Sequence, residues 1–287
     1  MSLDSIVEEF QNYEYNSTKI ISSSVKEELR INKNSNRDIL EIKKYMLHEI
    51  ITLLNKSILN RLSFDILFQK NYWSWGFVTL YYSNFFLAQT LNRLKGNFFT
   101  QVPEFKRRNI YLDSSDNEYK SSTSQDRDIH KAEFEKLREN YIFLLEDYTI
   151  NSSFRKAIPD DYTSPPYFNE SYIRNNINYK LSHYRELTFN DFKEGYHISD
   201  CIKRCNGNNN IGIDEFKLLD INNSRFNLLF DIIGRIKDNN SHFENKYNIF
   251  LEVLKDRFIE NYYHTNIHFH KISENLKRNL KGWLNEL

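Results

Sequence analysis

The side chains of this 287-residue chain that are best suited to chemistry are a few histidines and two cysteines. His264 and His268 would share one face of a helix at a spacing common in metal sites, and His270 lies close by in the sequence. No glutamate follows His264, as the zinc-protease pattern requires, and no third ligand is evident. Cys201 and Cys205 would supply half of a metal site, but four-ligand zinc usually needs a second pair. We therefore interpret these residues as ordinary thiols and structural histidines, and expect no metal and no cofactor.

The segment 206–216 has the acidic and asparagine-rich character of the second half of a calcium-binding EF-hand loop. If Glu215 took the last, bidentate position, Arg204 would stand where the first carboxylate belongs and Asn209 where glycine makes the turn. Calcium would lose its leading ligand, so we interpret this segment as a loop between helices.

Motifs for the common transfer reactions are missing from the sequence. It contains no GxxxxGK[ST], GxGxxG or GxSxG pattern, and its seven glycines allow few phosphate-cradling loops. The remaining chemistry needs few residues and no metal. In RNA cleavage, one histidine can move protons while one arginine stabilises the scissile phosphate.

The charges of the chain balance, with 39 Lys and Arg against 39 Asp and Glu. This balance argues against a protein that is coated in positive charge for bulk nucleic-acid or membrane binding, although a small basic cleft remains compatible with it. The acidic stretch from Met1 to Phe10 lacks an apolar signal core, and no apolar run reaches the ~20 residues of a membrane span. We expect a cytoplasmic protein without a membrane partner.

The elements that must position any site are mainly helical. Apolar residues recur at helical steps from Ile39 to Leu62, and the segment 73–94 is apolar nearly all round, so it belongs in the centre of a bundle or in an oligomer interface. Gly96 supplies a stop after this central aromatic helix, which we place at 73–95. Helicity resumes from Phe134 to Leu145.

Three segments follow from this pattern. Residues 1–36 form a polar, loosely packed N-terminal arm, 37–158 a helical bundle and 159–287 a helical second half. A break at Pro159, Pro165 and Pro166 separates the second half from the bundle. The polar stretch 107–128 is interpreted as a solvated excursion. The only candidate strands are 98–102 and 109–112, which are too little for a sheet-based fold.

Helices are expected in the second half at 171–186, 190–203, 214–237, 243–258 and 270–284, with Asn222-Asn223 as a candidate break in the third. Sparse glycine and proline between these apolar stripes predict an all-α fold, a multi-helix bundle.

The segment from Trp75 to Leu91, WGFVTLYYSNFFLAQTL, resembles the central helix of HEPN domains, in which a tyrosine pair is followed by small and aromatic residues. HEPN domains are all-helical and occur in toxin-antitoxin, abortive-infection and CRISPR-linked proteins. The resemblance covers this one helix. It implies a HEPN-like N-terminal half with additional C-terminal helices.

Catalytic HEPN domains carry an arginine, often followed by asparagine or another polar residue, with four to six residues before a histidine, and the pairs of two subunits line a cleft that cleaves RNA. Arg174-Asn175 has the favoured dipeptide, but eight residues separate Arg174 from His183. Arg257 and His264 have six residues between them, and we rank this pair second.

A third pair, Arg235 and His242, also has six residues between its members. Each pair has a structural alternative. Arg235 suits a helix end, where a cation favours the dipole, and Arg257 with His264 would suit a helix surface.

The resemblance thus implies a HEPN-like, metal-independent endoribonuclease, a hydrolase acting as a toxin or effector in antiviral defence. The alternative is a catalytically inactive helical interaction subunit of a defence or regulatory complex. The implied partners are RNA, a protein partner or antitoxin, and a second copy of the chain, with a dimer or other homo-oligomer formed through the aromatic helix.

Overall fold

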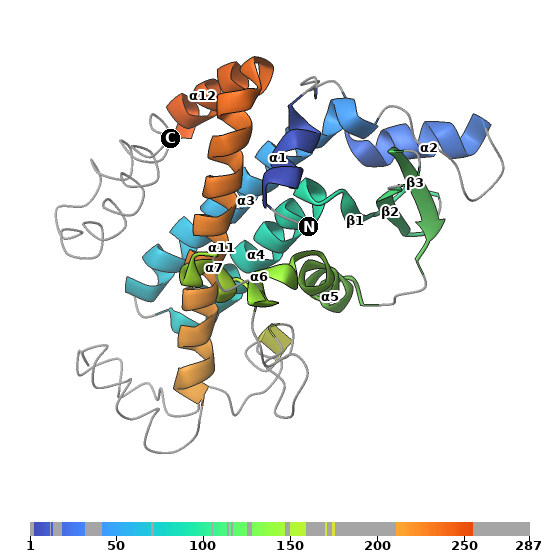
Figure 1. Ribbon diagram of the computed structural model, residues 1–287. Coiled ribbons are helices and arrows are strands. Elements are labelled where there is room, and N and C mark those ends of the chain that lie inside the picture. Colours follow the sequence, from blue (N-terminus) through green and yellow to red (C-terminus); the bar gives the residue numbers. More distant parts are fainter. Residues whose placement is uncertain are drawn as a thin grey trace, which may run out of the picture. The chain divides into compact units, whose positions relative to one another are not determined.

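The computed structural model describes residues 3–11, 13, 19–31, 42–69, 72–104, 106–113, 115, 117–124, 128–146, 150–158, 170, 174–175 and 211–254. Within these ranges the chain is mostly helical, with one small antiparallel sheet of order β1-β2-β3 (Figure 1). The predicted all-α class is confirmed. The predicted helices at 190–203 and 270–284 and the proline break lie outside the described residues.

The helices are α1 (Leu3–Phe10), α2 (Ile21–Ile31), α3 (Ile42–Gln69), α4 (Trp73–Leu94), α5 (Ile129–Tyr141), α6 (Phe143–Glu146), α7 (Ser152–Arg155), α11 (Ile211–Asn239) and α12 (Ser241–Leu254). The strands are β1 (Asn97–Thr100), β2 (Arg108–Asp113) and β3 (Glu118–Thr123). The aromatic helix α4 has the bounds expected from its apolar residues.

The chain divides into two compact units that interleave along the sequence. Unit 1 contains residues 1–52, 90–125 and 227–287, and unit 2 contains 53–89 and 126–226. Three of the four boundaries fall inside α3, α4 and α11, so each of these helices contributes residues to both units.

The N-terminal arm belongs to the core of unit 1 rather than packing loosely. Phe10 and Ile21 are completely buried. The Asn240 side chain donates hydrogen bonds to the backbone oxygens of Phe10 and Tyr13, at 2.8 and 3.0 Å, and accepts one from the Phe243 N–H. One asparagine therefore caps α12 and ties the end of α1 to it, which fixes a polar segment that its composition alone would leave loose.

Most of the stretch 107–128 forms a β-hairpin, so the prediction of a solvated excursion is wrong. β2 pairs with β1 and β3, with Ile110 opposite Phe98 and Ser121. β3 alternates in burial although it is polar, with Tyr119 and Ser121 turned inward. One of the two buried positions of β3 is a serine, so the strand lacks the hydrophobic alternation from which a strand is predicted.

Gly96 ends α4 as predicted. Its φ is +68°, and its N–H bonds to the Arg93 oxygen at 2.9 Å. A Cβ at this position would lie 2.9 Å from the Tyr119 hydroxyl and 3.2 Å from the Leu112 Cβ. Both the left-handed backbone and the close approach of β2 and β3 require glycine here.

Unit 2 buries three of the six described aromatic residues that α4 contributes to it. Phe77, Tyr81 and Phe85 are buried, whereas Tyr72 and Trp75 at the start of the helix are 61% and 65% exposed. The buried aromatic residues of α4 thus serve as bundle core, which is one of the two roles expected for this helix.

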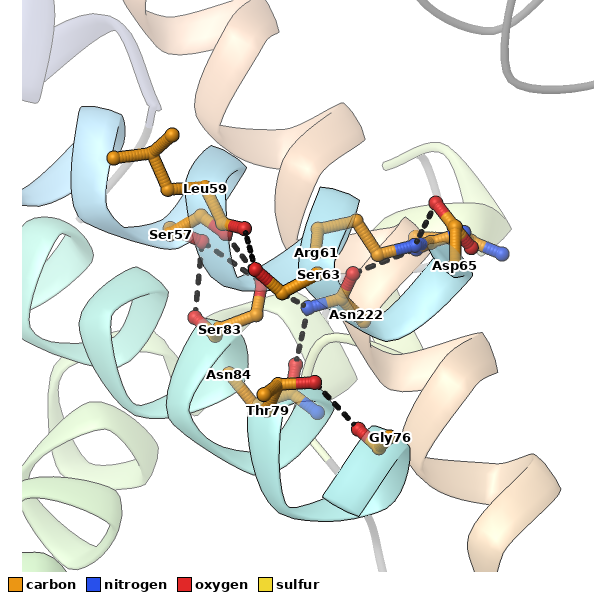
Figure 2. A network of polar contacts seen from close by, with 11 residues as sticks. Ser57, Leu59, Arg61, Ser63, Asp65, Gly76, Thr79, Ser83, Asn84 and Asn222 are labelled. Atoms are coloured by element: carbon orange, nitrogen blue, oxygen red, sulfur yellow. Dashed lines mark hydrogen bonds and ion pairs between the residues drawn. The ribbon is translucent and has the colours of Figure 1, made fainter. Parts of the chain in front are cut away.

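The expected break at Asn222-Asn223 does not occur, and α11 runs through it. The Asn222 amide donates to Ser83 Oγ at 2.9 Å and Asn84 Oδ1 at 3.1 Å, and its oxygen accepts from Arg61 at 2.7 Å (Figure 2). Asparagine breaks helices by bonding to its own backbone. Here its side chain is occupied by α3 and α4, so the helix continues.

Candidate functional site

The structure describes only some of the residues proposed for catalysis. Arg174 and Asn175 lie within the described ranges and are helical, whereas His183, Arg257 and His264 lie outside them. Cys201, Cys205, His268 and His270 lie outside as well. The two ranked Arg/His pairs therefore remain predictions.

Arg235 of the third pair is bound to carboxylates in unit 1. Its guanidinium lies 3.0 Å from Asp4 Oδ1 and 3.0 Å from Asp231 Oδ2. His242 follows the Asn240 cap in the first turn of α12, where it is exposed. These contacts agree with the structural interpretation of Arg235 as a residue near a helix end.

Arg174 has a different environment, in unit 2. Its guanidinium carbon lies 5.3 Å from the centroid of the Tyr81 ring, and its Nε and Nη2 donate to Asn175 Oδ1 at 3.2 and 2.6 Å. Cations over tyrosine rings are attracted by the ring quadrupole. The aromatic helix and the Arg-Asn dipeptide, which the sequence analysis singled out separately, therefore meet at Tyr81.

The same tyrosine reaches a histidine that the sequence analysis did not select. The Tyr81 hydroxyl lies 2.8 Å from His130 Nδ1. Tyr81 is completely buried, while His130 and Arg174 are half-buried. A guanidinium and an imidazole are thereby joined to one buried phenol, and we call Arg174, Asn175, Tyr81 and His130 the Tyr81 cluster.

His130 is fixed by its helix as well as by Tyr81. It stands in the first turn of α5, where Asp128 caps the helix by accepting a hydrogen bond from the His130 N–H at 2.9 Å. The imidazole ring packs on Phe85, with the ring centroids 4.2 Å apart and the planes tilted by 37°. An aromatic wall and a capped backbone thus limit the orientations of the imidazole.

The Tyr81 contact is compatible with either neutral tautomer of the imidazole. When Nδ1 carries the proton and donates it to the Tyr81 hydroxyl oxygen, the lone pair is on Nε2, which can then accept a proton from a substrate. When the hydroxyl donates instead, Nε2 carries the proton and can only donate a hydrogen bond, because the acid form of histidine is the imidazolium. The first arrangement suits the imidazole to act as a general base.

The partners of Arg174 distinguish it from Arg225 and Arg93, which both pair with carboxylates. Arg225 of unit 2 pairs with Glu170 at 2.7 Å, and Arg93 of unit 1 pairs with Glu49 at 2.7 Å. Among the described residues, Arg174 contacts an amide oxygen and a tyrosine ring, which are both neutral. Within the described residues its positive charge therefore meets no carboxylate, and it can attract an anion.

A second polar group in unit 2 joins α3, α4 and α11 (Figure 2). Ser57 and Ser83 exchange hydroxyl contacts at 3.1 Å, and Arg61 lies 3.4 Å from Asp65. Burial raises the pKa of Asp65, and the Arg61 charge opposes this effect. These side chains bond mostly to one another across helices, so we interpret the group as an internal network that sets the helix register.

His130 shows what the sequence could not reveal. It is far from Arg174 along the chain, and no local spacing joins them. The only local signal is Asp128, a residue type favoured at helix N-caps, which predicts where α5 starts but not what its first turn touches.

No three His, Cys, Asp or Glu side chains gather as a metal site in the part of the chain that the structure describes. Of the helices within the described ranges, none combines the length and the apolar character needed to cross a membrane. No protein-family model matches the chain, and no match was found among curated proteins or solved structures.

Proposed function

We propose that this chain is a metal-independent endoribonuclease of the HEPN-like kind, in which Arg174 binds the scissile phosphate and His130 is the general base. The observation that supports the proposal is the Tyr81 cluster, where a guanidinium with neutral partners and a hydrogen-bonded imidazole share one tyrosine. The resemblance of the α4 sequence to HEPN domains supports the same activity. A role as a toxin or effector in antiviral defence belongs to this proposal.

The reaction needs only these two side chains and the ribose of the substrate. The His130 Nε2 takes the proton of a ribose 2′-hydroxyl, and the 2′-oxygen attacks the adjacent phosphorus. The bond from phosphorus to the 5′-oxygen breaks, and the leaving oxygen takes up a proton from water. The products are a 2′,3′-cyclic phosphate and a 5′-hydroxyl end.

Arg174 would act on the charge that develops at phosphorus. A guanidinium has five N–H donors, and two of its nitrogens already bond to Asn175. Asn175 thus orients the guanidinium plane, while the remaining donors can contact the phosphate oxygens. Stabilisation of this kind is usually among the largest contributions to phosphoryl chemistry.

The test is cleavage of a single-stranded RNA by the purified full chain, with EDTA present. We expect Arg174→Ala and His130→Ala to lower the rate by about 100-fold or more, the usual effect of removing a charge-stabilising donor or a general base. Arg235→Ala and His242→Ala are matched controls in unit 1 and should keep the wild-type rate. Wild-type cleavage by both cluster variants, or none by the wild type, would overturn the proposal.

The same assay compares His130 with the histidines expected from sequence. His183→Ala and His264→Ala test the pairs that begin at Arg174 and Arg257. A loss of cleavage in His183→Ala, with full activity in His130→Ala, would transfer the base role to His183.

A second candidate function is an interaction subunit without catalysis. It is favoured by Tyr72 and Trp75, large aromatic residues that are exposed at the start of α4. A protein partner, an antitoxin or a second copy of the chain would cover them. Association that is lost in Trp75→Ser, from a chain that cleaves no RNA, would support this function over the first.

A further inference from the structure

Arg225 is a charged side chain placed at the centre of unit 2. It lies on α11 and is completely buried, as is its partner Glu170. The Arg225 Nη1 and Nη2 donate to the two carboxylate oxygens of Glu170 at 3.0 and 2.7 Å. Such a two-point contact fixes both the distance and the relative orientation of the two groups.

The other contacts of Arg225 reach the elements of the Tyr81 cluster. Its Nε donates to the Ala157 backbone oxygen at 3.0 Å, and its Nη1 lies 3.5 Å from the Asn84 backbone oxygen on α4, the helix of Tyr81. Its guanidinium lies 5.2 Å from the Phe134 ring centroid. Phe134 is one turn after His130 on α5, and its ring lies 6.0 Å from that of Tyr81.

The Glu170 contact reaches the remaining member of the cluster. Glu170 precedes Arg174 by four positions, so the chain between them spans at most about 14 Å. Arg225 thus holds the segment that carries Arg174, packs on the helix that carries His130 and touches the helix that carries Tyr81. It contacts neither the guanidinium of Arg174 nor the imidazole itself among the described contacts.

We infer that the Arg225–Glu170 ion pair is the positioning device of the Tyr81 cluster and sets the place of Arg174 relative to Tyr81 and His130. This inference rests on the proposed function for its consequence in catalysis, although the geometry can be tested without it. A buried ion pair contributes little net stability when compared with apolar residues of similar volume. The two-point contact with Glu170 and the contacts of Arg225 with Ala157, Asn84 and Phe134 favour a positioning role over a stabilising one.

The experiment uses the full chain with Glu170→Gln, which keeps the shape but removes the charge, and with the double variant Arg225→Met/Glu170→Met, which replaces the pair by apolar side chains. The matched control is Asp65→Asn, which neutralises another buried carboxylate paired with an arginine in unit 2. Circular dichroism in the aromatic region establishes that each variant is folded at the assay temperature.

The first readout is the imidazole ¹⁵N and ¹H signal of His130, assigned by its loss in His130→Ala. We expect Glu170→Gln and the double variant to shift this signal as Arg174→Ala does. The pair variants should displace the Arg174 guanidinium from the Tyr81 ring that bonds to His130, and Arg174→Ala removes that guanidinium altogether. Asp65→Asn should leave it in place. An unchanged His130 signal in both folded pair variants would overturn the inference, whatever the RNA assay shows.

The second readout is RNA cleavage. A small displacement of a catalytic group typically costs about 100-fold, so we expect kcat to fall about 100-fold in Glu170→Gln with KM close to wild type. Unchanged kcat in the folded pair variants would contradict the positioning role while leaving the proposed function intact. Failure of the proposed function would instead appear as full activity in Arg174→Ala and His130→Ala.

Discussion

Tyr81→Phe tests the contribution of the Tyr81 hydroxyl apart from that of the ring. The substitution removes the 2.8 Å contact to His130 Nδ1 and keeps the ring beneath Arg174 and against Phe134. A typical intramolecular hydrogen bond contributes about 1 kcal/mol net. Because His130 is half-buried, water can partly replace the lost partner, so we expect the free energy of unfolding to fall by no more than ~1 kcal/mol.

The expected effect on catalysis is larger than the effect on stability. Without the hydroxyl, Tyr81 no longer holds the orientation of the His130 ring, and a small misplacement of a catalytic group can cost about 100-fold in rate. The assays are urea unfolding, kcat for RNA cleavage and the ¹⁵N shifts of His130, which report the fraction of each tautomer.

The matched control is Tyr82→Phe, the next residue of the same helix, whose ring also lies 6.2 Å from the His130 ring. It should leave stability, tautomer and kcat unchanged. If Tyr81→Phe alters the His130 shifts no more than Tyr82→Phe does, the reasoning about the hydroxyl is refuted.

Two further predictions concern unit 1. Gly96→Ala should lower the free energy of unfolding by about 1–2 kcal/mol, since alanine disfavours the φ of +68° and its Cβ would meet the Tyr119 hydroxyl; an unchanged urea midpoint would contradict this. Burial lowers the pKa of Lys95 from 10.5 to about 8, so the unfolded chain binds the extra proton above pH 8. Stability should therefore rise from pH 8 towards about 9.5, and Lys95→Met should remove that rise in thermal unfolding.

Local sequence signals predicted the helices well. α4 ends where glycine at position 96 permits a left-handed residue, and Ile42, Met46 and Ile50 of α3 are all buried, as their spacing predicts. These features depend on residues within a few turns of one another, which is the range over which sequence periodicity carries information.

The candidate strands at 98–102 and 109–112 correspond to β1 and β2, but β3 and the packing of the arm were missed because distant partners determine them. Ser121 becomes a buried strand residue only through its pairing with Ile110 of β2. The polar arm is held by Asn240, which lies almost at the other end of the described chain. No window of neighbouring residues contains either contact, so tertiary structure overrode the local polarity.

The candidate site divides in the same way. Arg174-Asn175 was found because it is a dipeptide, and the Tyr81 helix because its composition is distinctive. The connection between them, and the place of His130, arise from packing among α4, α5 and the segment at Glu170. The sequence therefore pointed to Arg174 and to the helix of Tyr81. It assigned the general base to His183 or His264, which lie closer to their arginines along the chain than His130 lies to Arg174.

The zero net charge of the chain does not mean that every cation is neutralised locally. Arg225 is neutralised by a buried carboxylate, and Arg235 by two carboxylates at the surface. Arg174 meets only an amide oxygen and an aromatic face among the described residues, so its field is not cancelled at close range. A chain with zero net charge can thus present a cation at one place, and the attraction felt by a phosphate depends on which arginines are paired rather than on how many there are.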